Sequence, residues 1–199
     1  LAVFFLARIL GALYFINNIN EDDLVKRCRR ALWGNTALFL VFFLAFVIRT
    51  LLADGYAVRP ETGEVFMEPY KYLTNFLQMP VVLLVFLVGV VAVLWGIIRT
   101  LWKPAFDKGI WFAGAGTVLT VLALLLVAGY NNTAYYPSTH DLQSSLTLAN
   151  SCSSQFTLKV MAYVSILVPF VLAYIFYAWR SIDNRKIDAK EMEEGGHAY

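Results

Sequence analysis

Charged residues are scarce in this chain, and four long stretches contain none at all. Asp, Glu, Lys and Arg make up 15% of its 199 residues, compared with about 25% in an average soluble protein. No Asp, Glu, Lys, Arg or His occurs at 31–48, 81–98, 109–130 or 160–179. Each run is close to the roughly 20 apolar residues that carry an α-helix across a bilayer. The scarcity of charge excludes an ordinary soluble domain and predicts a polytopic membrane protein.

These runs also lack the ten-residue alternation of polar and apolar residues that is typical of outer-membrane strands. Backbone groups in hydrocarbon must satisfy one another, which favours helices. We therefore predict an all-α fold, a polytopic membrane helical bundle of about five transmembrane helices within residues 1–182. The expected spans are about 1–19, 31–52, 80–99, 109–130 and 158–180. Because the chain opens at Leu1 without an initiator Met, we expect it to be N-terminally incomplete.

Basic residues gather in three of the expected connections, and this sets the orientation of the bundle. Short cytoplasmic loops of membrane proteins carry an excess of Lys and Arg. The loop at 51–79 holds both acidic and basic residues, and the loop at 130–156 holds no Lys or Arg. We therefore place these two loops outside and the tail at 183–199 in the cytoplasm. The inner basic residues are Lys26, Arg27, Arg29 and Arg30, then Arg99, Lys103 and Lys108, then Arg180, Arg185, Lys186 and Lys190. Since no basic stripe interleaves with exposed aromatics, no nucleic acid is expected as a partner.

A short amphipathic stretch at 68–80 precedes the third span. One interpretation is a helix lying in the headgroup plane, and the other is an ordinary loop. In both, Pro80 is expected to open the next helix, because proline is tolerated in the first helical turn.

Residues that hold metals or haem are few. The two histidines, His140 and His197, fall in an outer loop and in the tail, so neither offers an axial ligand at membrane depth. Met161 is interpreted as a core residue. Paired carboxylates, His pairs and CxxC spacing are also missing beside the spans. The sequence therefore predicts no catalytic residue, cofactor site or metal site in this chain. Cys28 and Cys152 fall on opposite sides of the membrane, which excludes a disulfide between them.

Arg8 is the one charged residue expected at depth within a span, since Arg49 and Arg99 lie at span ends. An ionised group at membrane depth is costly unless it is paired, so it is treated as a functional candidate. Two interpretations remain open. A structural role, in which Arg8 snorkels to the interface or pairs with a carboxylate on a missing helix or a partner subunit, is favoured over contact with a ligand.

The serine-rich outer loop precedes the last span. We expect the segment Ser144–Thr157 to cap that helix, with the hydroxyl of Ser154 or Thr157 accepting backbone N–H groups. A hydrolytic nucleophile is not supported, because His140 is the only base that accompanies these hydroxyls.

Several local motifs, taken in order, resemble those of subunit II of the cytochrome bd quinol oxidases. Their order and spacing relative to the five spans cover almost the whole chain. The motifs are Asp54-Gly55-Tyr56, then Tyr72-Leu73, Asn75-Phe76 and Pro80, then Ser144-Ser145-Leu146-Thr147, Ser153-Ser154-Gln155, Thr157-Leu158 and Val160-Met161, and finally His197-Ala198-Tyr199.

The resemblance implies a scaffold role. Family subunits have nine spans, and the five here would be the last five, a four-helix bundle plus one extra helix. The missing first half carries a polar proton-access route in the family. The partner implied is the haem-bearing subunit I, which holds haem b and haem d, oxidises quinol near the outer face and reduces oxygen to water. The resemblance also allows a structural quinone, bound lipid and a small accessory subunit, in the bacterial inner membrane. Rival interpretations are a transporter or channel subunit and a purely structural assembly factor.

Overall fold

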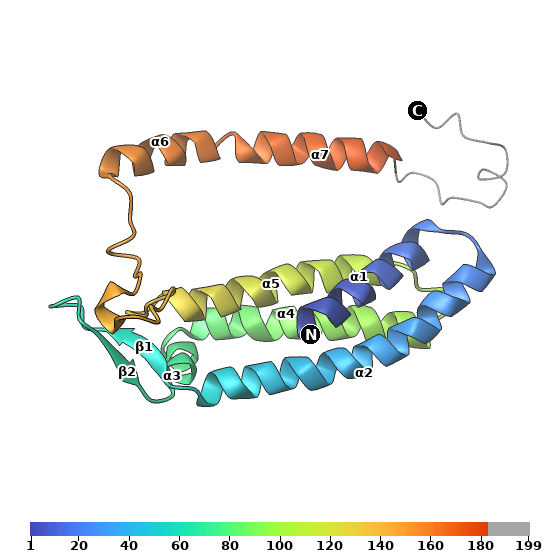
Figure 1. The fold of residues 1–199 in the computed structure, drawn as a ribbon. Helices are drawn as coiled ribbons and strands as arrows, with labels where there is room; N and C mark the ends of the chain where they lie inside the picture. The colour runs from blue at the N-terminus through green and yellow to red at the C-terminus, as the bar shows by residue number, and fades with distance from the viewer. Residues whose placement is uncertain (183–199) are drawn as a thin grey trace.

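The computed structural model describes residues 1–182 and shows a helical bundle with one further helix standing apart (Figure 1). The helices are α1 (Ala2–Asn18), α2 (Asp22–Leu52), α3 (Lys71–Gln78), α4 (Pro80–Trp102), α5 (Gly109–Gly129), α6 (Gln155–Ser165) and α7 (Val168–Ile182). The strands β1 (Gly55–Val58) and β2 (Val65–Glu68) and the 3-10 turn η1 (Leu142–Ser144) lie in the two outer loops. The tail at 183–199, including His197, lies outside the described residues.

Four helical segments are long and apolar enough to cross a membrane. They are α2, α4, α5 and the combined α6–α7 segment, while α1 is a shorter apolar helix of 17 residues. The prediction of an all-α polytopic membrane bundle is confirmed. Helix α2 begins at Asp22, well before the span expected at 31–52, because its first turn carries Asp22 and Asp23 and acidic residues are favourable at a helix N-terminus.

The stretch at 68–80, for which two interpretations were open, contains a helix. α3 occupies Lys71–Gln78, and Pro80 opens α4 at its first turn as expected. The β1–β2 hairpin is a small addition to the all-α fold, with Gly55 opposite Glu68 and Val58 opposite Val65. Both short elements lie at the same end of the bundle, next to the last turn of α5 (Figure 1).

Small residues allow α4 and α5 to pack very closely. A Cβ atom added at Gly116 would lie 2.5 Å from the carbonyl oxygen of Gly89 and 2.7 Å from the backbone nitrogen of Val93. One added at Gly96 would lie 2.6 Å from the carbonyl oxygen of Gly109. Within a membrane the hydrophobic effect does not drive helices together, so they associate largely through close packing, which glycine allows. The buried core around this pair consists of Ile9, Ala12, Leu13, Leu32, Phe39, Val93, Ile97 and Ala113.

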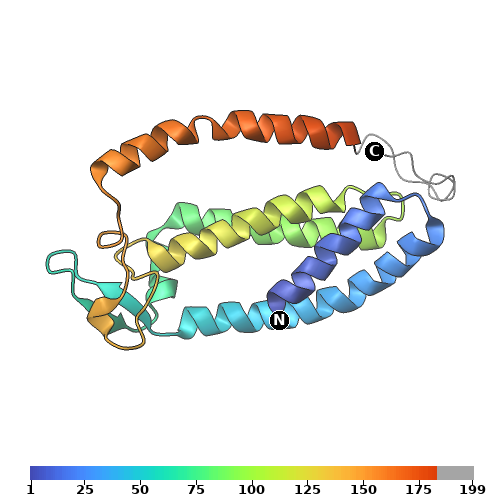
Figure 2. The same cartoon turned by 45° about the horizontal axis from the view of Figure 1, so that its top comes forward.

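The last span lies alongside the bundle without being buried in it (Figures 1 and 2). None of the spanning window in Gln155–Ser181 is buried within the described chain. The helix breaks between α6 and α7 because Pro169 has no N–H to donate and its ring clashes with the carbonyl four residues earlier, at Ser165. Most of the apolar surface of this helix is therefore left to lipid or to other polypeptides.

Candidate functional site

The two outer loops join into one structure, which we call the outer cap and define as β1, β2, α3 and residues 130–150. Residues after α5 pair with β1: the backbone N–H of Val58 donates to the Asn132 carbonyl at 2.8 Å, and that of Ala134 donates to the Tyr56 carbonyl at 2.9 Å. An isolated bridge between Ala57 and Thr133 belongs to the same pairing. The cap thereby connects the outer ends of α2, α4 and α5.

Asn75 lies at the centre of the outer cap and is fully buried. Its side-chain amide donates to the carbonyl of Val127 at 2.9 Å and to the hydroxyl of Thr133 at 2.8 Å. Its carbonyl oxygen accepts a bond of 3.0 Å from the side chain of Asn131, which also donates to Gln78. One side chain therefore fastens α3 to the last turn of α5 and to the loop that follows it.

The loop can take this path because Asn131 and Asn132 both adopt a left-handed backbone conformation, with φ of 58° and 53°. Asparagine is among the few non-glycine residues that tolerate this region. The pair terminates α5 and turns the chain back toward β1. Sequence reasoning missed this role, although two asparagines directly after an apolar span were a usable signal.

The exposed edge of the hairpin is paired by a side chain. The side-chain amide of Gln143 accepts from the backbone N–H of Val65 at 3.0 Å and donates to the Val65 carbonyl at 2.8 Å. It thus makes the two hydrogen bonds that a neighbouring strand would make. Nearby, Lys71 is buried and forms an ion pair of 3.1 Å with Glu68. Burial raises the pKa of the Tyr72 phenol, and the neighbouring Tyr56 acts in the same direction, so Tyr72 is protonated at neutral pH. The cap is thus a closed, hydrogen-bonded cover.

On the inner side, Arg29 holds the start of α2 against the loop between α4 and α5. Its guanidinium donates to the carbonyls of Thr100, Pro104 and Phe106, the last two at 2.7 and 3.4 Å. These carbonyls lie where α4 ends, and orphan C=O groups at a helix end need donors. The sequence placed Arg29 only among the inner positive charges, because nothing in the pattern showed which cation would bridge two helices.

Replacing Arg29 with alanine is expected to lower the stability of the protein by about 1–3 kcal/mol, because the hydrogen bonds from a charged donor to the carbonyls of Thr100, Pro104 and Phe106 are lost. The measurement is the thermal midpoint of the protein purified in detergent. Arg27→Ala is the matched control, since Arg27 lies two residues earlier on α2 and is exposed. Equal midpoints for the two variants would show that the bridge contributes nothing.

The three side chains singled out from the sequence are not brought together. Arg8 is exposed on α1, and its guanidinium lies 5.7 Å from the centre of the Phe4 ring. Ser154 and Thr157 lie far along the chain, at the start of α6. They do not form a common site with Arg8.

Ser154 is the N-cap of α6. Its hydroxyl accepts from the backbone N–H of Thr157 at 3.3 Å and lies 3.0 Å from the Thr157 hydroxyl. The structure thus separates the two residues that the sequence left as alternatives: Ser154 supplies the capping oxygen, and Thr157 supplies the backbone N–H.

We expect Ser154→Ala to cost about 1 kcal/mol, the usual effect of losing an N-cap oxygen. Thr157→Ala should cost less, because its backbone N–H still reaches Ser154. Ser153→Ala is the control, since Ser153 is an exposed neighbour outside the helix. Thermal midpoints of the three variants measure the ranking. A larger loss for Thr157→Ala than for Ser154→Ala would contradict the assignment of the cap.

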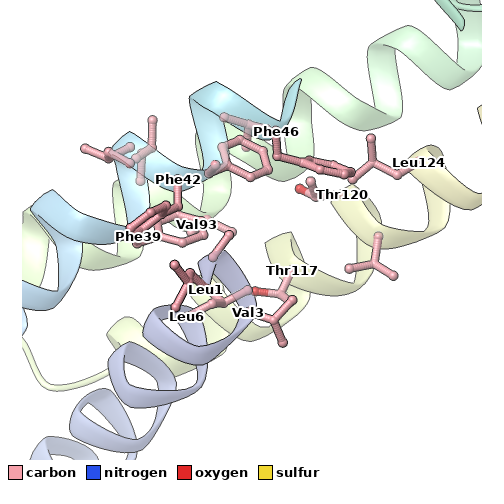
Figure 3. A pocket seen from close by; sticks show the side chains of 16 residues that line it. Leu1, Val3, Leu6, Phe39, Phe42, Phe46, Val93, Thr117, Thr120 and Leu124 are labelled. Carbon is pink, nitrogen blue, oxygen red and sulfur yellow. The ribbon is translucent and has the colours of Figure 1, made fainter. Parts of the chain in front are cut away.

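An apolar pocket of about 520 Å³ opens between α1, α2, α4 and α5 (Figure 3). Aromatic side chains of α2, including Phe39, Phe42 and Phe46, form one wall (Figure 3). The hydroxyls of Thr117 and Thr120 are its polar groups, but each already donates to a carbonyl of its own helix. The pocket has the size of a small-molecule site and suits an apolar chain better than a polar headgroup.

Neither His140 nor Met161 lies inside the bundle, where a haem would need an axial ligand. Within residues 1–182, no group of three or more His, Cys, Asp or Glu side chains is placed to hold a metal ion. His140 is exposed in the outer cap, where its backbone N–H donates to Ser138. Met161 was expected to be a core residue, but it is 63% exposed because α6 stands apart from the bundle. We therefore derive no chemical step at a haem from these side chains.

Comparison with known proteins agrees with the architecture. The model of the family described as cytochrome bd terminal oxidase subunit II matches residues 1–182. The chain is 30% identical over 155 residues to cytochrome bd-I ubiquinol oxidase subunit 2 of Escherichia coli strain K12, and the match covers 77% of this chain and 39% of that relative. The same protein of Escherichia coli O157:H7 gives the same values. The chain thus spans about two fifths of the length of these relatives. Since the family match extends over every described residue, the chain belongs to the cytochrome bd terminal oxidase subunit II family.

Proposed function

We propose that this chain acts as the haem-free subunit of a cytochrome bd-type quinol:oxygen oxidoreductase and supports the haem-bearing subunit I. The observation that carries the proposal is the family match over residues 1–182. Haem b and haem d are assigned to the partner subunit. Catalysis is assigned to the complex, and no autonomous activity is assigned to this chain.

The proposed reaction couples two half-reactions on opposite sides of the membrane. Subunit I oxidises quinol near the outer face and releases its protons there. The electrons reduce oxygen to water with protons taken from the inside. Charge separation therefore builds a proton gradient without a pump. For this coupling, the membrane part of the complex must prevent protons from leaking back between the helices.

The described residues support such a sealing role. The outer cap covers the outer ends of α2, α4 and α5 through Asn75, and Arg29 binds α2 to the inner loop between α4 and α5. The bundle between these two ends is apolar. We place the protein in the bacterial inner membrane as a multi-pass subunit with a cytoplasmic C-terminus, as the distribution of Lys and Arg favours.

The apolar pocket offers space for a bound chain within the scaffold. Its lining suits a lipid acyl chain or the isoprenoid tail of a structural quinone, because most of its side chains are apolar and the hydroxyls of Thr117 and Thr120 already donate within their own helix. Quinol as a substrate belongs to subunit I in this proposal, and so does the oxygen site. A small accessory subunit remains compatible with the exposed α6–α7 helix.

The first test is an optical spectrum of the complex purified from its host through a tag on this polypeptide. We expect the dithionite-reduced minus air-oxidised difference to show b-haem bands and a chlorin band in the red region, together with a larger haem-bearing subunit. Protein that purifies without haem, or with unrelated partners, would contradict the proposal and favour the transporter interpretation.

A further inference from the structure

All five tryptophans of the chain lie near the inner end of the bundle, and each is more than half exposed. Tryptophan side chains are enriched at the level of the lipid headgroups. Because these five belong to four different helices, they mark the inner headgroup level around the bundle. They are Trp33 at the start of the charge-free run of α2, Trp95 and Trp102 toward the end of α4, Trp111 at the start of α5 and Trp179 toward the end of α7.

Arg99 lies at this level, in the last turn of α4 and directly after the charge-free run at 81–98. Its guanidinium lies 5.4 Å from the centre of the Trp95 ring and 5.1 Å from the centre of the Phe106 ring. Two aromatic rings on the same cation hold it in place. Arg99 donates no hydrogen bond to residues 1–182 and forms no ion pair with them.

The contrast with Arg29 shows what is unusual here. The guanidinium of Arg29 donates to three backbone carbonyls, whereas that of Arg99 is positioned by aromatic contacts alone. Stacking uses the flat faces of a guanidinium, and its N–H groups point outward from the edge. The N–H groups of Arg99 are therefore available to an anion.

The side of α4 that carries Arg99 has the order of polarity of a phospholipid. Val88, Val91 and Trp95 follow one another at helical spacing on this side, and all are about half exposed or more. This apolar stripe ends at Arg99, and the exposed Lys103 follows one turn later. From Val88 to Arg99 the helix rises about 16 Å, close to half of a hydrocarbon layer of about 30 Å. A single phospholipid supplies both an apolar chain of this reach and a phosphate at its end.

We propose that Arg99 binds the phosphate of an inner-leaflet phospholipid whose acyl chain lies along Val88, Val91 and Trp95. Arginine suits this role because its planar fork of donors binds phosphate through two parallel hydrogen bonds. Lys103 adds a second positive charge, so an anionic phospholipid is preferred to a zwitterionic one. The inference rests on the membrane placement of α4 and not on the proposed oxidase function.

Native mass spectrometry of the protein purified from its host in mild detergent tests the site, with phosphatidylglycerol added in increasing amounts. We expect Arg99→Gln to weaken the tightest bound phosphatidylglycerol about tenfold, because hydrogen bonds from a charged donor are lost. Arg30→Gln is the matched control. Arg30 is exposed and directly precedes the charge-free run at 31–48, so this variant removes the same charge at the same membrane level. Equal weakening in the two variants would overturn the proposal, and so would unchanged binding in Arg99→Gln, which would mean that a group of a polypeptide occupies Arg99.

Two further variants test the site without changing Arg99. Phe106→Leu removes one of the two rings and should weaken binding about threefold, since the guanidinium is then held less firmly. Lys103→Gln should lower the preference for phosphatidylglycerol over phosphatidylcholine about fivefold. An unchanged preference would refute the assignment of an anionic lipid. Excess inorganic phosphate should not displace the lipid because it lacks acyl chains, and displacement would show a general phosphate site instead.

Discussion

Replacing Gly116 with alanine is expected to destabilise the protein by about 1–3 kcal/mol, the cost of forcing extra atoms into a well-packed core. The added Cβ would lie 2.5 Å from the carbonyl oxygen of Gly89, 2.7 Å from the backbone nitrogen of Val93 and 2.9 Å from the Cβ of Ala92. Two of these are backbone atoms, which cannot rotate away. The α4–α5 pair must therefore separate, and the core contacts of Ala113 and Ile97 separate with it.

The matched control lies two residues earlier on the same helix. A Cβ added at Gly114 meets nothing within 4 Å, so Gly114→Ala should leave stability unchanged or raise it by about 0.5–1 kcal/mol through the better helix propensity of alanine. Thermal midpoints of the purified protein and the yield of assembled complex measure both variants. Equal loss in the two variants would mean that the close contact between α4 and α5 is not what stabilises the bundle.

Substituting Asn75 with leucine is expected to cost about 3 kcal/mol or more. Leucine has a similar size, so the change isolates the loss of hydrogen bonds from the loss of volume. The carbonyl of Val127, the hydroxyl of Thr133 and the amide of Asn131 would lose a partner. Each buried polar group left unpaired costs roughly 1–3 kcal/mol. We expect a lower thermal midpoint and faster proteolysis of the loop after α5.

Two further variants make the Asn75 result specific. Leu77→Ala changes the same short helix at a side chain that is 67% exposed, and it should have little effect. A double-mutant cycle with Thr133→Ala should show a coupling of about 0.5–3 kcal/mol, as is usual for groups in direct contact. Additive losses would show that Asn75 and Thr133 act separately and that water replaces the missing amide.

Ser154 and Arg29 show which features of the structure a local sequence pattern can predict. Ser154, the N-cap of α6, is one of the two candidates that the sequence offers, because Ser and Thr before an apolar run are local signals that depend only on neighbouring backbone groups. Arg29 could be assigned only to the inner surface. Its partners are the carbonyls of Thr100, Pro104 and Phe106, more than 70 positions away in the chain, and no local pattern specifies such a pairing.

The sequence by itself determined the membrane architecture and predicts its orientation. Both follow from the free energy of placing charged and apolar residues in water or hydrocarbon, which depends on composition and spacing rather than on contacts. The tertiary structure alone decided that Gly89 and Gly116 bring α4 and α5 together and that Asn75 fastens the outer cap. It also decided that Arg8 faces away from the core. These features require helices that are distant in sequence to meet at a particular rotation about their axes. Hydrophobicity is nearly uniform around apolar helices such as α4 and α5, so composition could not predict which face of each helix meets the other.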